Sequence, residues 1–106
     1  MAARGVEIMI TELDVIDRAA PGGIAKRDAA VAATYKRFLD VALAEKAVKT
    51  VVVWGLCDRN SWIDWMNPRT KRADGLHPRP LLFDEEYRPK PVYTTVAEVL
   101  AGAPRR

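Results

Sequence analysis

Two carboxylates stand where the first apolar segment of the chain ends. Glu12 and Asp14 belong to the run Thr11-Glu12-Leu13-Asp14, which follows the apolar residues 6–10. In parallel α/β barrels the reactive groups lie at the carboxyl ends of the strands. A carboxylate in such a place can act as a nucleophile or exchange protons with a bound molecule. We therefore predict that Glu12 and Asp14 belong to a functional site.

Two tryptophans mark the end of the next apolar segment, residues 48–56. Trp54 and Trp62 occur in the pattern Trp-Gly-x-x-Asp-x-x-Ser-Trp. Taken without that pattern, Trp54 is most simply a core residue and Trp62 an exposed aromatic of a loop. Asp58 and Ser61 of the same pattern are short polar residues, and we predict that they shape the loop by hydrogen-bonding to backbone groups.

The elements that must position these residues follow the order strand, helix, strand, long loop, helix, which indicates the α/β class. Residues 6–10 are nearly all apolar, as in a parallel strand buried on both faces. A Pro-Gly-Gly turn precedes an Ala-rich helix over residues 26–45, and residues 48–56 form the second strand. The predicted apolar face of this helix consists of Val31, Tyr35, Phe38 and Ala42.

Side-chain alternation predicts which way the carboxylates point. If the extended conformation continues past residue 10, one face of the first strand carries Val6, Ile8, Ile10, Glu12 and Asp14. Both carboxylates would then point to the same side, into the mouth of a barrel.

A long polar loop and a last helix complete the chain. Residues 59–80 are rich in Asn, Asp, Gly and Pro, and a loop of this length in a compact domain is usually functional. Pro91 opens the last helix, and Gly102 and Pro104 stop it. The apolar face predicted for this helix consists of Tyr93, Val96, Ala97 and Leu100.

Composition excludes several classes of protein. The chain is 49% hydrophobic and 29% charged with no long apolar stretch, so we expect no membrane partner. The net charge of +3 is scattered and lacks interleaved aromatics, so we expect no nucleic-acid partner. The basic run Arg69, Lys71 and Arg72 is most simply a solvated loop face. Cys57 and His77 form no recognisable ligand set, so no metal is expected.

Three motifs together resemble a known family. The Thr-Glu-Leu-Asp run, the Trp-to-Trp pattern and the segment Pro-Leu-Leu-Phe-Asp at residues 80–84, followed by Lys90-Pro91, occur in this order. The set is similar to the carboxyl-terminal portion of glycoside hydrolase family 10, the endo-β-1,4-xylanases. The resemblance implies a partial (β/α)8 TIM barrel, with strands seven and eight and their helices. A complete barrel needs about 250 residues, so residues 1–106 are expected to be one carboxyl-terminal fragment of the catalytic domain.

The resemblance also implies roles for the candidate residues. Family 10 enzymes retain the configuration of the sugar, and the motif match makes Glu12 the nucleophile and Asp14 the residue that orients and tunes it. Trp54 and Trp62 would bind β-1,4-xylan or a xylo-oligosaccharide, because a flat indole suits the C–H face of a sugar. The mechanism needs no metal or organic cofactor. Trp65, outside the pattern, either extends the sugar platform or anchors the loop.

The acid/base residue of the family is a Glu in an Asn-Glu pair on an earlier strand, and the chain contains no Asn-Glu pair. We therefore expect the isolated chain to be inactive and its partner to be the preceding part of the barrel. One alternative is a non-catalytic carbohydrate-binding or interaction module, a remnant of an enzyme. Another is a barrel glycosidase acting on a different β-linked glycan. Because family members are typically exported, we expect a secreted or periplasmic protein, although the chain shows no signal segment.

Overall fold

The computed structural model describes residues 4–64 and 66–106. Its elements, in chain order, are β1 (Ile8–Leu13), α1 (Ile24–Ala44), β2 (Val48–Val53), the short 3-10 helix η2 (Asp58–Asn60) and α2 (Pro91–Ala101). This is the predicted order of strand, helix, strand, loop and helix. None of the helices in the described ranges is both long and apolar enough to cross a bilayer.

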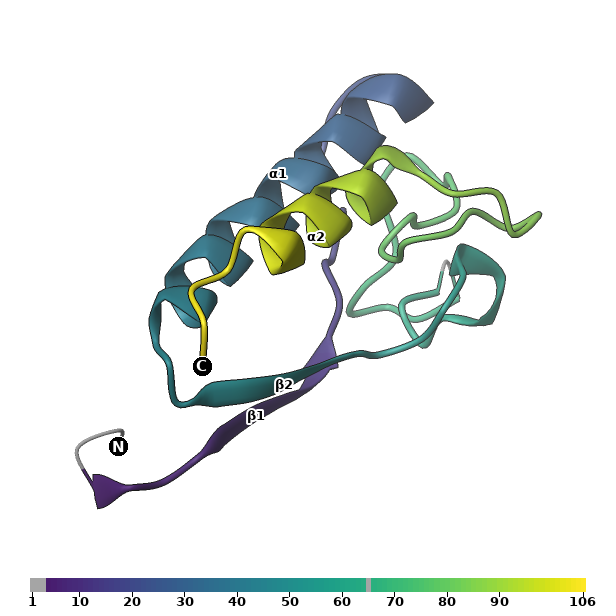
Figure 1. The fold of residues 1–106 in the computed structure, drawn as a ribbon. Coiled ribbons are helices and arrows are strands. Elements are labelled where there is room, and N and C mark those ends of the chain that lie inside the picture. The colour runs from purple at the N-terminus through teal and green to yellow at the C-terminus, as the bar shows by residue number, and fades with distance from the viewer. Residues whose placement is uncertain (1–3, 65) are drawn as a thin grey trace.

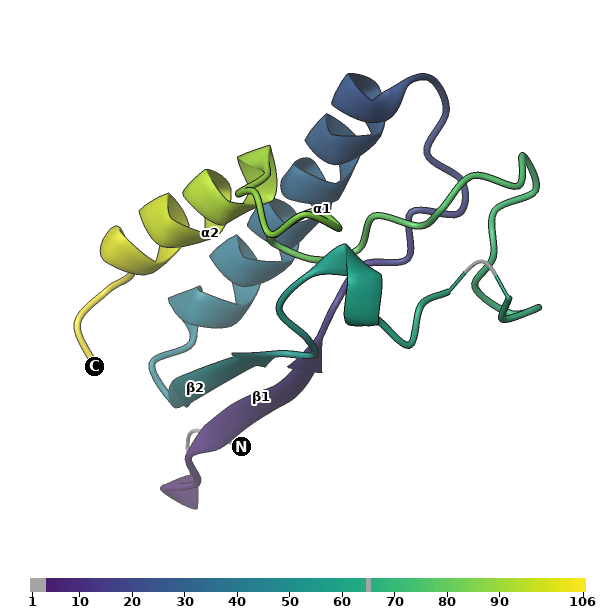
Figure 2. The ribbon, with the colours of Figure 1, turned by 90° about the vertical axis from the view of Figure 1, so that its right-hand side faces the viewer.

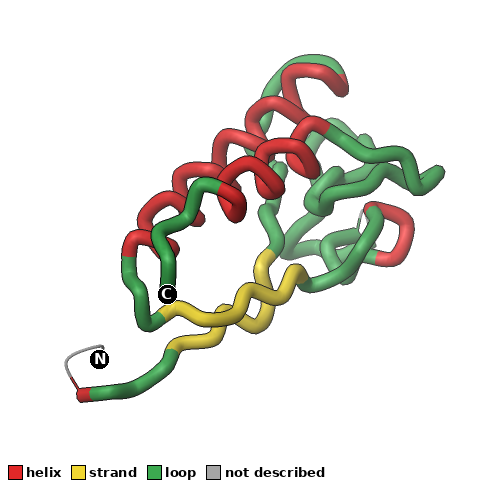
Figure 3. The backbone as a smooth tube through the Cα atoms, viewed as in Figure 1, coloured by secondary structure: helices red, strands yellow, loops and turns green. Residues whose placement is uncertain are grey.

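The structure has two layers. Strands β1 and β2 pair in parallel, as predicted, and α1 and α2 lie side by side over one face of this sheet (Figures 1 and 2). The loops that follow β1 and β2 gather at the carboxyl ends of the two strands, whereas the short connection from α1 to β2 lies at the opposite end (Figure 3). This arrangement brings the residues that follow β1 and those that follow β2 to the same edge of the sheet.

The side-chain alternation of β1 breaks before its end. Ile8 and Ile10 pack against the core under the helices, but the register with β2 is irregular between Ile10 and Leu13. As a result Leu13 is buried on the helix side, while Glu12 is exposed. The prediction that Glu12 shares a face with Ile8 and Ile10 is therefore wrong, because a bulge shifts the alternation by one residue.

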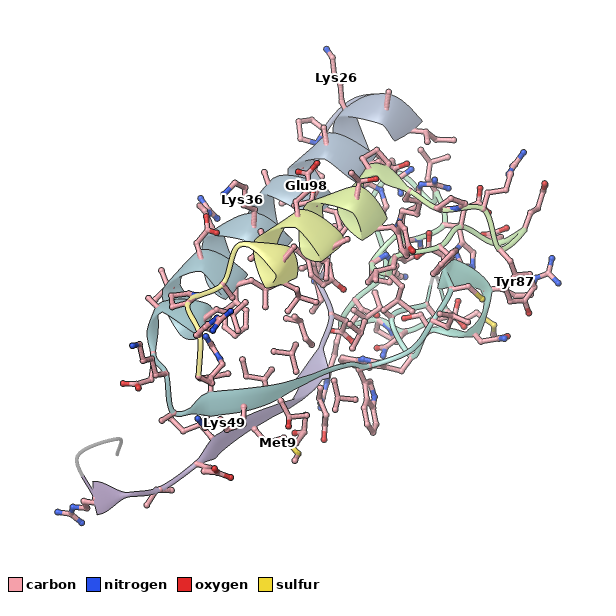
Figure 4. The ribbon with its side chains drawn as sticks, in the orientation of Figure 1. Met9, Lys26, Lys36, Lys49, Tyr87 and Glu98 are labelled. Atoms are coloured by element: carbon pink, nitrogen blue, oxygen red, sulfur yellow. The ribbon has the colours of Figure 1, made fainter. Side chains whose placement is uncertain are left out.

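Burial of the first strand on both faces is also not what the structure shows. Met9 is 59% exposed and points away from the helices (Figure 4), and Val6 is exposed as well. Val52 of β2 is exposed. The sheet therefore has one face packed on the helices and another that carries exposed apolar side chains.

Helix α1 begins and ends within two residues of its predicted bounds, but its buried face differs. The core side chains of the helix are Val31, Tyr35, Leu39 and Leu43, an i, i+4 series. Phe38, predicted to lie in the core, is 45% exposed. The buried face of the helix follows these residues, which are four positions apart. The Ala-rich sequence does not distinguish this row from the adjacent row that contains Phe38.

Helix α2 begins at Pro91, as predicted, and its capping residue is Gly102. Its buried side chains are Val92 and Val96, whereas Tyr93 and Leu100 remain about half exposed. The predicted face is therefore rotated by about one residue. The Tyr93 ring packs instead against Phe83, with ring centroids 5.3 Å apart.

Strand β2 ends at Val53, before the predicted limit of residue 56, because the backbone turns at Gly55. The φ angle of Gly55 is +121°, a conformation that other residues rarely adopt. A Cβ atom at this position would lie 2.8 Å from Cδ1 of Leu81. Gly55 is thus required both by its backbone angle and by the close approach of the returning loop.

Replacing Gly55 with Ala is expected to lower the free energy of unfolding of the protein by about 1–3 kcal/mol, because backbone strain adds to the contact with Leu81. Urea unfolding followed by circular dichroism measures this loss. Gly23→Ala is the comparison, since Gly23 has an ordinary φ of −73° and space for a Cβ; as the N-cap residue of α1 it should show only the smaller loss of a poorer cap. Equal losses for both variants would contradict the proposed role of Gly55.

Candidate functional site

The candidate site lies at the carboxyl ends of β1 and β2. Glu12, next to the last residue of β1, is exposed and accessible to a bound molecule. The backbone N–H of Trp54 donates to the carbonyl of Leu13 at 2.9 Å. This bond fixes the start of the second motif directly beside the end of the first. Trp54 itself is 47% exposed.

A side-chain hydrogen bond joins the two motifs. The indole Nε1–H of Trp62 donates to Oδ2 of Asp14 at 2.6 Å. Trp62 is 50% exposed and Asp14 is half-buried, so the ring stands at the surface with its polar edge held. The structure therefore brings together all four residues singled out in the sequence: Glu12 of β1, Asp14 directly after it, and two tryptophans from the segment after β2.

The electrostatics of Asp14 connect it with Glu12. Burial raises the pKa of the Asp14 carboxyl, the hydrogen bond from Trp62 lowers it, and the nearby charge of Glu12 raises it. Because like charges repel, the state in which both carboxylates are ionised costs free energy. The indole N–H partly offsets that cost by donating to the charged form of Asp14.

Replacing Trp62 with Phe keeps a flat ring but removes the N–H donor. We expect the pKa of Asp14 to rise further. Of the three effects on this pKa, the hydrogen bond from Trp62 is the one that favours the charged carboxylate, and the variant loses it. A titration of the carboxyl ¹³C signals measures the shift. Trp54→Phe is the control, and an unchanged Asp14 pKa in Trp62→Phe would contradict the coupling.

A buried ion pair shapes the loop that carries Trp62. Oδ1 of Asp58 accepts from the backbone N–H of Leu81 at 2.9 Å, and Oδ2 accepts from Nζ of Lys90 at 3.0 Å. The same Nζ donates to the carbonyls of Arg79 at 2.8 Å and Leu81 at 2.7 Å. Burial raises the pKa of Asp58 and lowers that of Lys90, and each charge opposes the shift of the other. All three Nζ hydrogens are thus used.

The predicted loop-shaping role of Asp58 and Ser61 is confirmed. Asp58 reaches the backbone of the returning segment at Leu81, far along the chain. Ser61 acts locally, since its Oγ accepts from the N–H of Ile63 at 3.0 Å. Both fix the backbone on either side of Trp62.

Tyr35 is a buried polar residue near the site that the sequence marked only as core. Its hydroxyl donates to the carbonyl of Pro80 at 2.9 Å. Burial raises the Tyr35 pKa, and the charges of Asp14 and Asp58 raise it further. Tyr35 therefore remains a neutral donor that ties α1 to the long loop. Its helical spacing was visible in the sequence, but its hydroxyl partner was not.

The prediction of a solvated basic run is wrong for Arg72. Arg69 and Lys71 are exposed, as a solvated loop face requires. Arg72, by contrast, is only 5% exposed and binds Asp74 and backbone carbonyls of the loop after β1. No local pattern reveals this burial, because those carbonyls come from a segment distant in the sequence.

The remaining predictions concern a metal site, Cys57 and Trp65. Within residues 4–64 and 66–106, no group of three or more His, Cys, Asp or Glu is placed to hold a metal ion. Cys57 is buried, as expected for a small packed residue. Trp65 lies outside the described residues.

Comparison with known proteins identifies the family. The model of glycosyl hydrolase family 10 matches residues 1–99. The chain belongs to this family. It is 34% identical over 104 residues to endo-1,4-beta-xylanase B of Thermotoga neapolitana, covering 93% of this chain and 26% of that protein. It is 32% identical over 101 residues to endo-1,4-beta-xylanase B of Neocallimastix patriciarum, covering 95% of this chain and 10% of that protein.

Solved structures of the family agree with the fold described above. Xylanase 10B of Thermotoga petrophila RKU-1, solved in complex with xylobiose, superposes with a TM-score of 0.73 at 32% identity. The match covers 94% of this chain and 28% of that one. This family 10 chain thus spans about a quarter or less of the length of these two xylanases. The prediction of family 10 membership is confirmed, and the α/β architecture matches part of the family's barrel structures.

Proposed function

We propose that residues 1–106 form the last two strand-helix units of a (β/α)8 barrel that hydrolyses internal β-1,4-xylosidic bonds with retention of configuration. The observation that carries this proposal is the hydrogen bond from Trp62 to Asp14. It unites the two motifs at the carboxyl ends of β1 and β2, the edge where barrel enzymes hold their reactive groups. The substrate class comes from the relatives, which are named as xylanases.

In this proposal Glu12 is the nucleophile. Its exposed carboxylate attacks the anomeric carbon, the glycosidic bond breaks, and a covalent glycosyl-enzyme forms that water then hydrolyses. Asp14 orients and tunes Glu12 through the charge interaction between them. Trp54 and Trp62, both about half exposed, provide flat surfaces for the sugars beside the cleaved bond.

The leaving oxygen needs a proton from a second carboxyl group about 5–5.5 Å from the nucleophile. Asp14 is already engaged by the indole of Trp62. We assign the proton donor to the preceding part of the barrel, as the family resemblance implies. This assignment makes the 106-residue chain inactive alone.

The exposed surface of the chain supports its place in a larger barrel. In the described part of the chain, β1 and β2 pair only with each other, so each strand has an edge without a partner. The sheet face turned away from the helices carries exposed apolar side chains, among them Met9 and Val52. In a closed barrel, neighbouring strands cover such edges and interior side chains fill such a face.

The test compares the full-length protein that contains residues 1–106 with the isolated chain. We expect the full-length protein to release xylo-oligosaccharides from β-1,4-xylan, and the isolated chain to release none. Robust hydrolysis by the isolated chain would contradict the assignment of the proton donor.

Two other results of this comparison would favour the alternatives. Cleavage of a β-1,4-glucan with little action on xylan would point to a glycosidase for a different glycan. Binding of xylan by the full-length protein without cleavage would point to a carbohydrate-binding remnant. The test therefore separates the three functions by product and substrate.

A further inference from the structure

Two loops at the candidate site are joined by a buried arginine. The loop after β1 contains Asp17 and Ala20, and the loop after β2 contains Arg72. Nη1 of Arg72 donates to the carbonyl of Asp17, and Nη2 donates to the carbonyl of Ala20 at 2.8 Å. Arg72 is 5% exposed. A planar guanidinium with several fixed donors is suited to hold two backbone carbonyls at once.

A second carboxylate holds the arginine in its place. Nε and Nη2 of Arg72 donate to the Oδ1 and Oδ2 atoms of Asp74 at 3.0 and 2.6 Å, a bidentate pair. The hydrogen bonds from Arg72 lower the pKa of Asp74 to about 2. Asp74 is therefore charged at neutral pH, and its two oxygens orient the guanidinium toward the other loop.

Asp17 adds a second connection between the loops. Its side chain is buried, and Oδ2 lies 2.9 Å from Nη2 of Arg27 and 3.6 Å from Nη1 of Arg72. The same Nη2 of Arg27 donates to the carbonyl of His77 at 2.6 Å. We call Asp17, Arg27, Arg72 and Asp74 the Arg72 clamp. Its four side chains connect the start of α1, the loop after β1 and the loop after β2.

The clamp and the candidate site share the same two loops. Asp14 and Asp17 belong to the segment after β1, whereas Trp62 and Arg72 belong to the segment after β2. The bond from Trp62 to Asp14 is exposed to solvent. A single exposed hydrogen bond is too weak to order a loop of this length against its conformational entropy. The order must come from buried contacts: the Asp58–Lys90 pair holds the two ends of the loop to each other, and the clamp holds the loop to the segment after β1.

We propose that Arg72 is a positioning residue that holds the Trp62 loop against the loop after β1, so that the Trp62 indole stays hydrogen-bonded to Asp14. Among the described residues, Arg72 makes no hydrogen bond or ion pair with Asp14 or Trp62, so it acts through the backbone that carries them. Through this contact it determines where the indole meets a bound sugar and how Asp14 is oriented beside Glu12. The effect on sugar binding rests on the proposed function, but the effect on Trp62 itself does not.

The test follows the Trp62 indole directly. The tryptophans of the full-length protein are labelled with ¹⁵N, and the Trp62 signal is assigned by its loss in Trp62→Phe. In Arg72→Met we expect this signal to shift and broaden, because the loop loses its hold on the Asp17 and Ala20 carbonyls. Lys71→Met is the matched control: it removes a neighbouring positive charge that is exposed, and it should leave the signal unchanged.

A second variant and a kinetic measurement complete the test. Asp74→Asn removes the negative charge and one of the two acceptor oxygens that orient Arg72 but leaves the core intact, so it should shift the Trp62 signal in the same direction by less. On a xylo-oligosaccharide, Arg72→Met should lower kcat/KM about tenfold, as expected for a misplaced binding group. Lys71→Met should stay near the wild-type value.

The outcomes separate the clamp from the proposed function. If Arg72→Met and Asp74→Asn lower only the melting temperature and leave the Trp62 signal unchanged, Arg72 is merely structural and the inference is overturned. If Arg72→Met does not fold, Asp74→Asn decides the question. Absence of xylanase activity in the wild-type protein would overturn the proposed function, while the Trp62 signal would still decide the role of Arg72.

Discussion

Replacing Glu12 with Gln is expected to lower kcat for xylan hydrolysis by about a thousandfold or more, the scale of loss seen when a catalytic nucleophile is removed. The amide has nearly the same shape as the carboxylate but cannot attack the anomeric carbon. Because Glu12 is exposed and outside the core, the variant should fold normally. Steady-state kinetics with an aryl xylobioside measure the effect.

The control for this variant is Glu7→Gln, an identical change at an exposed glutamate just before β1. It should leave kcat unchanged. A further variant, Glu12→Ala, leaves a space that azide can enter, and azide should restore cleavage with an inverted glycosyl azide as the product. Retention of more than a small fraction of activity in Glu12→Gln would contradict the assignment of the nucleophile.

Replacing Lys90 with Met should cost about 3–5 kcal/mol in the free energy of unfolding, the largest stability effect that we expect. The change leaves the Asp58 carboxylate buried without its cation, and it leaves the carbonyls of Arg79 and Leu81 without a donor. Both ends of the loop that carries Trp62 would lose their anchor. Urea unfolding of the full-length protein, monitored by circular dichroism, measures the loss.

Arg88→Met is the control for the buried pair. Arg88 also pairs with an aspartate, Asp84, at 3.0 Å, but its side chain is 69% exposed. Exposed ion pairs contribute little to stability, so this variant should change the free energy of unfolding only slightly. In Asp58→Asn/Lys90→Met no buried charge is left unpaired, so part of the stability should return. A similar small effect of Lys90→Met and Arg88→Met would contradict the importance of burial.

The sequence was sufficient to predict the order of the elements and the edge of the sheet at which the four candidate residues lie. Runs of apolar residues and turn signals predicted both strands and both helices in the right order, and the motifs led to Glu12, Asp14, Trp54 and Trp62. The structure places these four at one edge of the sheet, since Trp62 bonds to Asp14 and the Trp54 backbone bonds to Leu13. Their roles in catalysis remain predictions.

The errors have two physical causes. Periodicity shows that a segment is amphipathic, but in α1 and α2 it did not decide between neighbouring rows of small apolar residues, and it missed the bulge before Leu13. Pairing between distant segments leaves no local pattern at all. The prediction of a solvated Arg72 is wrong for this reason, since the guanidinium binds the carbonyls of Asp17 and Ala20 in the other loop. The contacts that fix the long loop are of this second kind.

The most direct test of the central claim is to trap the covalent intermediate. A 2-deoxy-2-fluoro-xylobioside with a good leaving group reacts in the first step of a retaining mechanism, while the fluorine slows the second step. Peptide mass spectrometry of the full-length protein should then find the fluorinated sugar on Glu12. A label on another carboxylate, or an active enzyme that takes up no label, would contradict Glu12 as the nucleophile of a retaining xylanase.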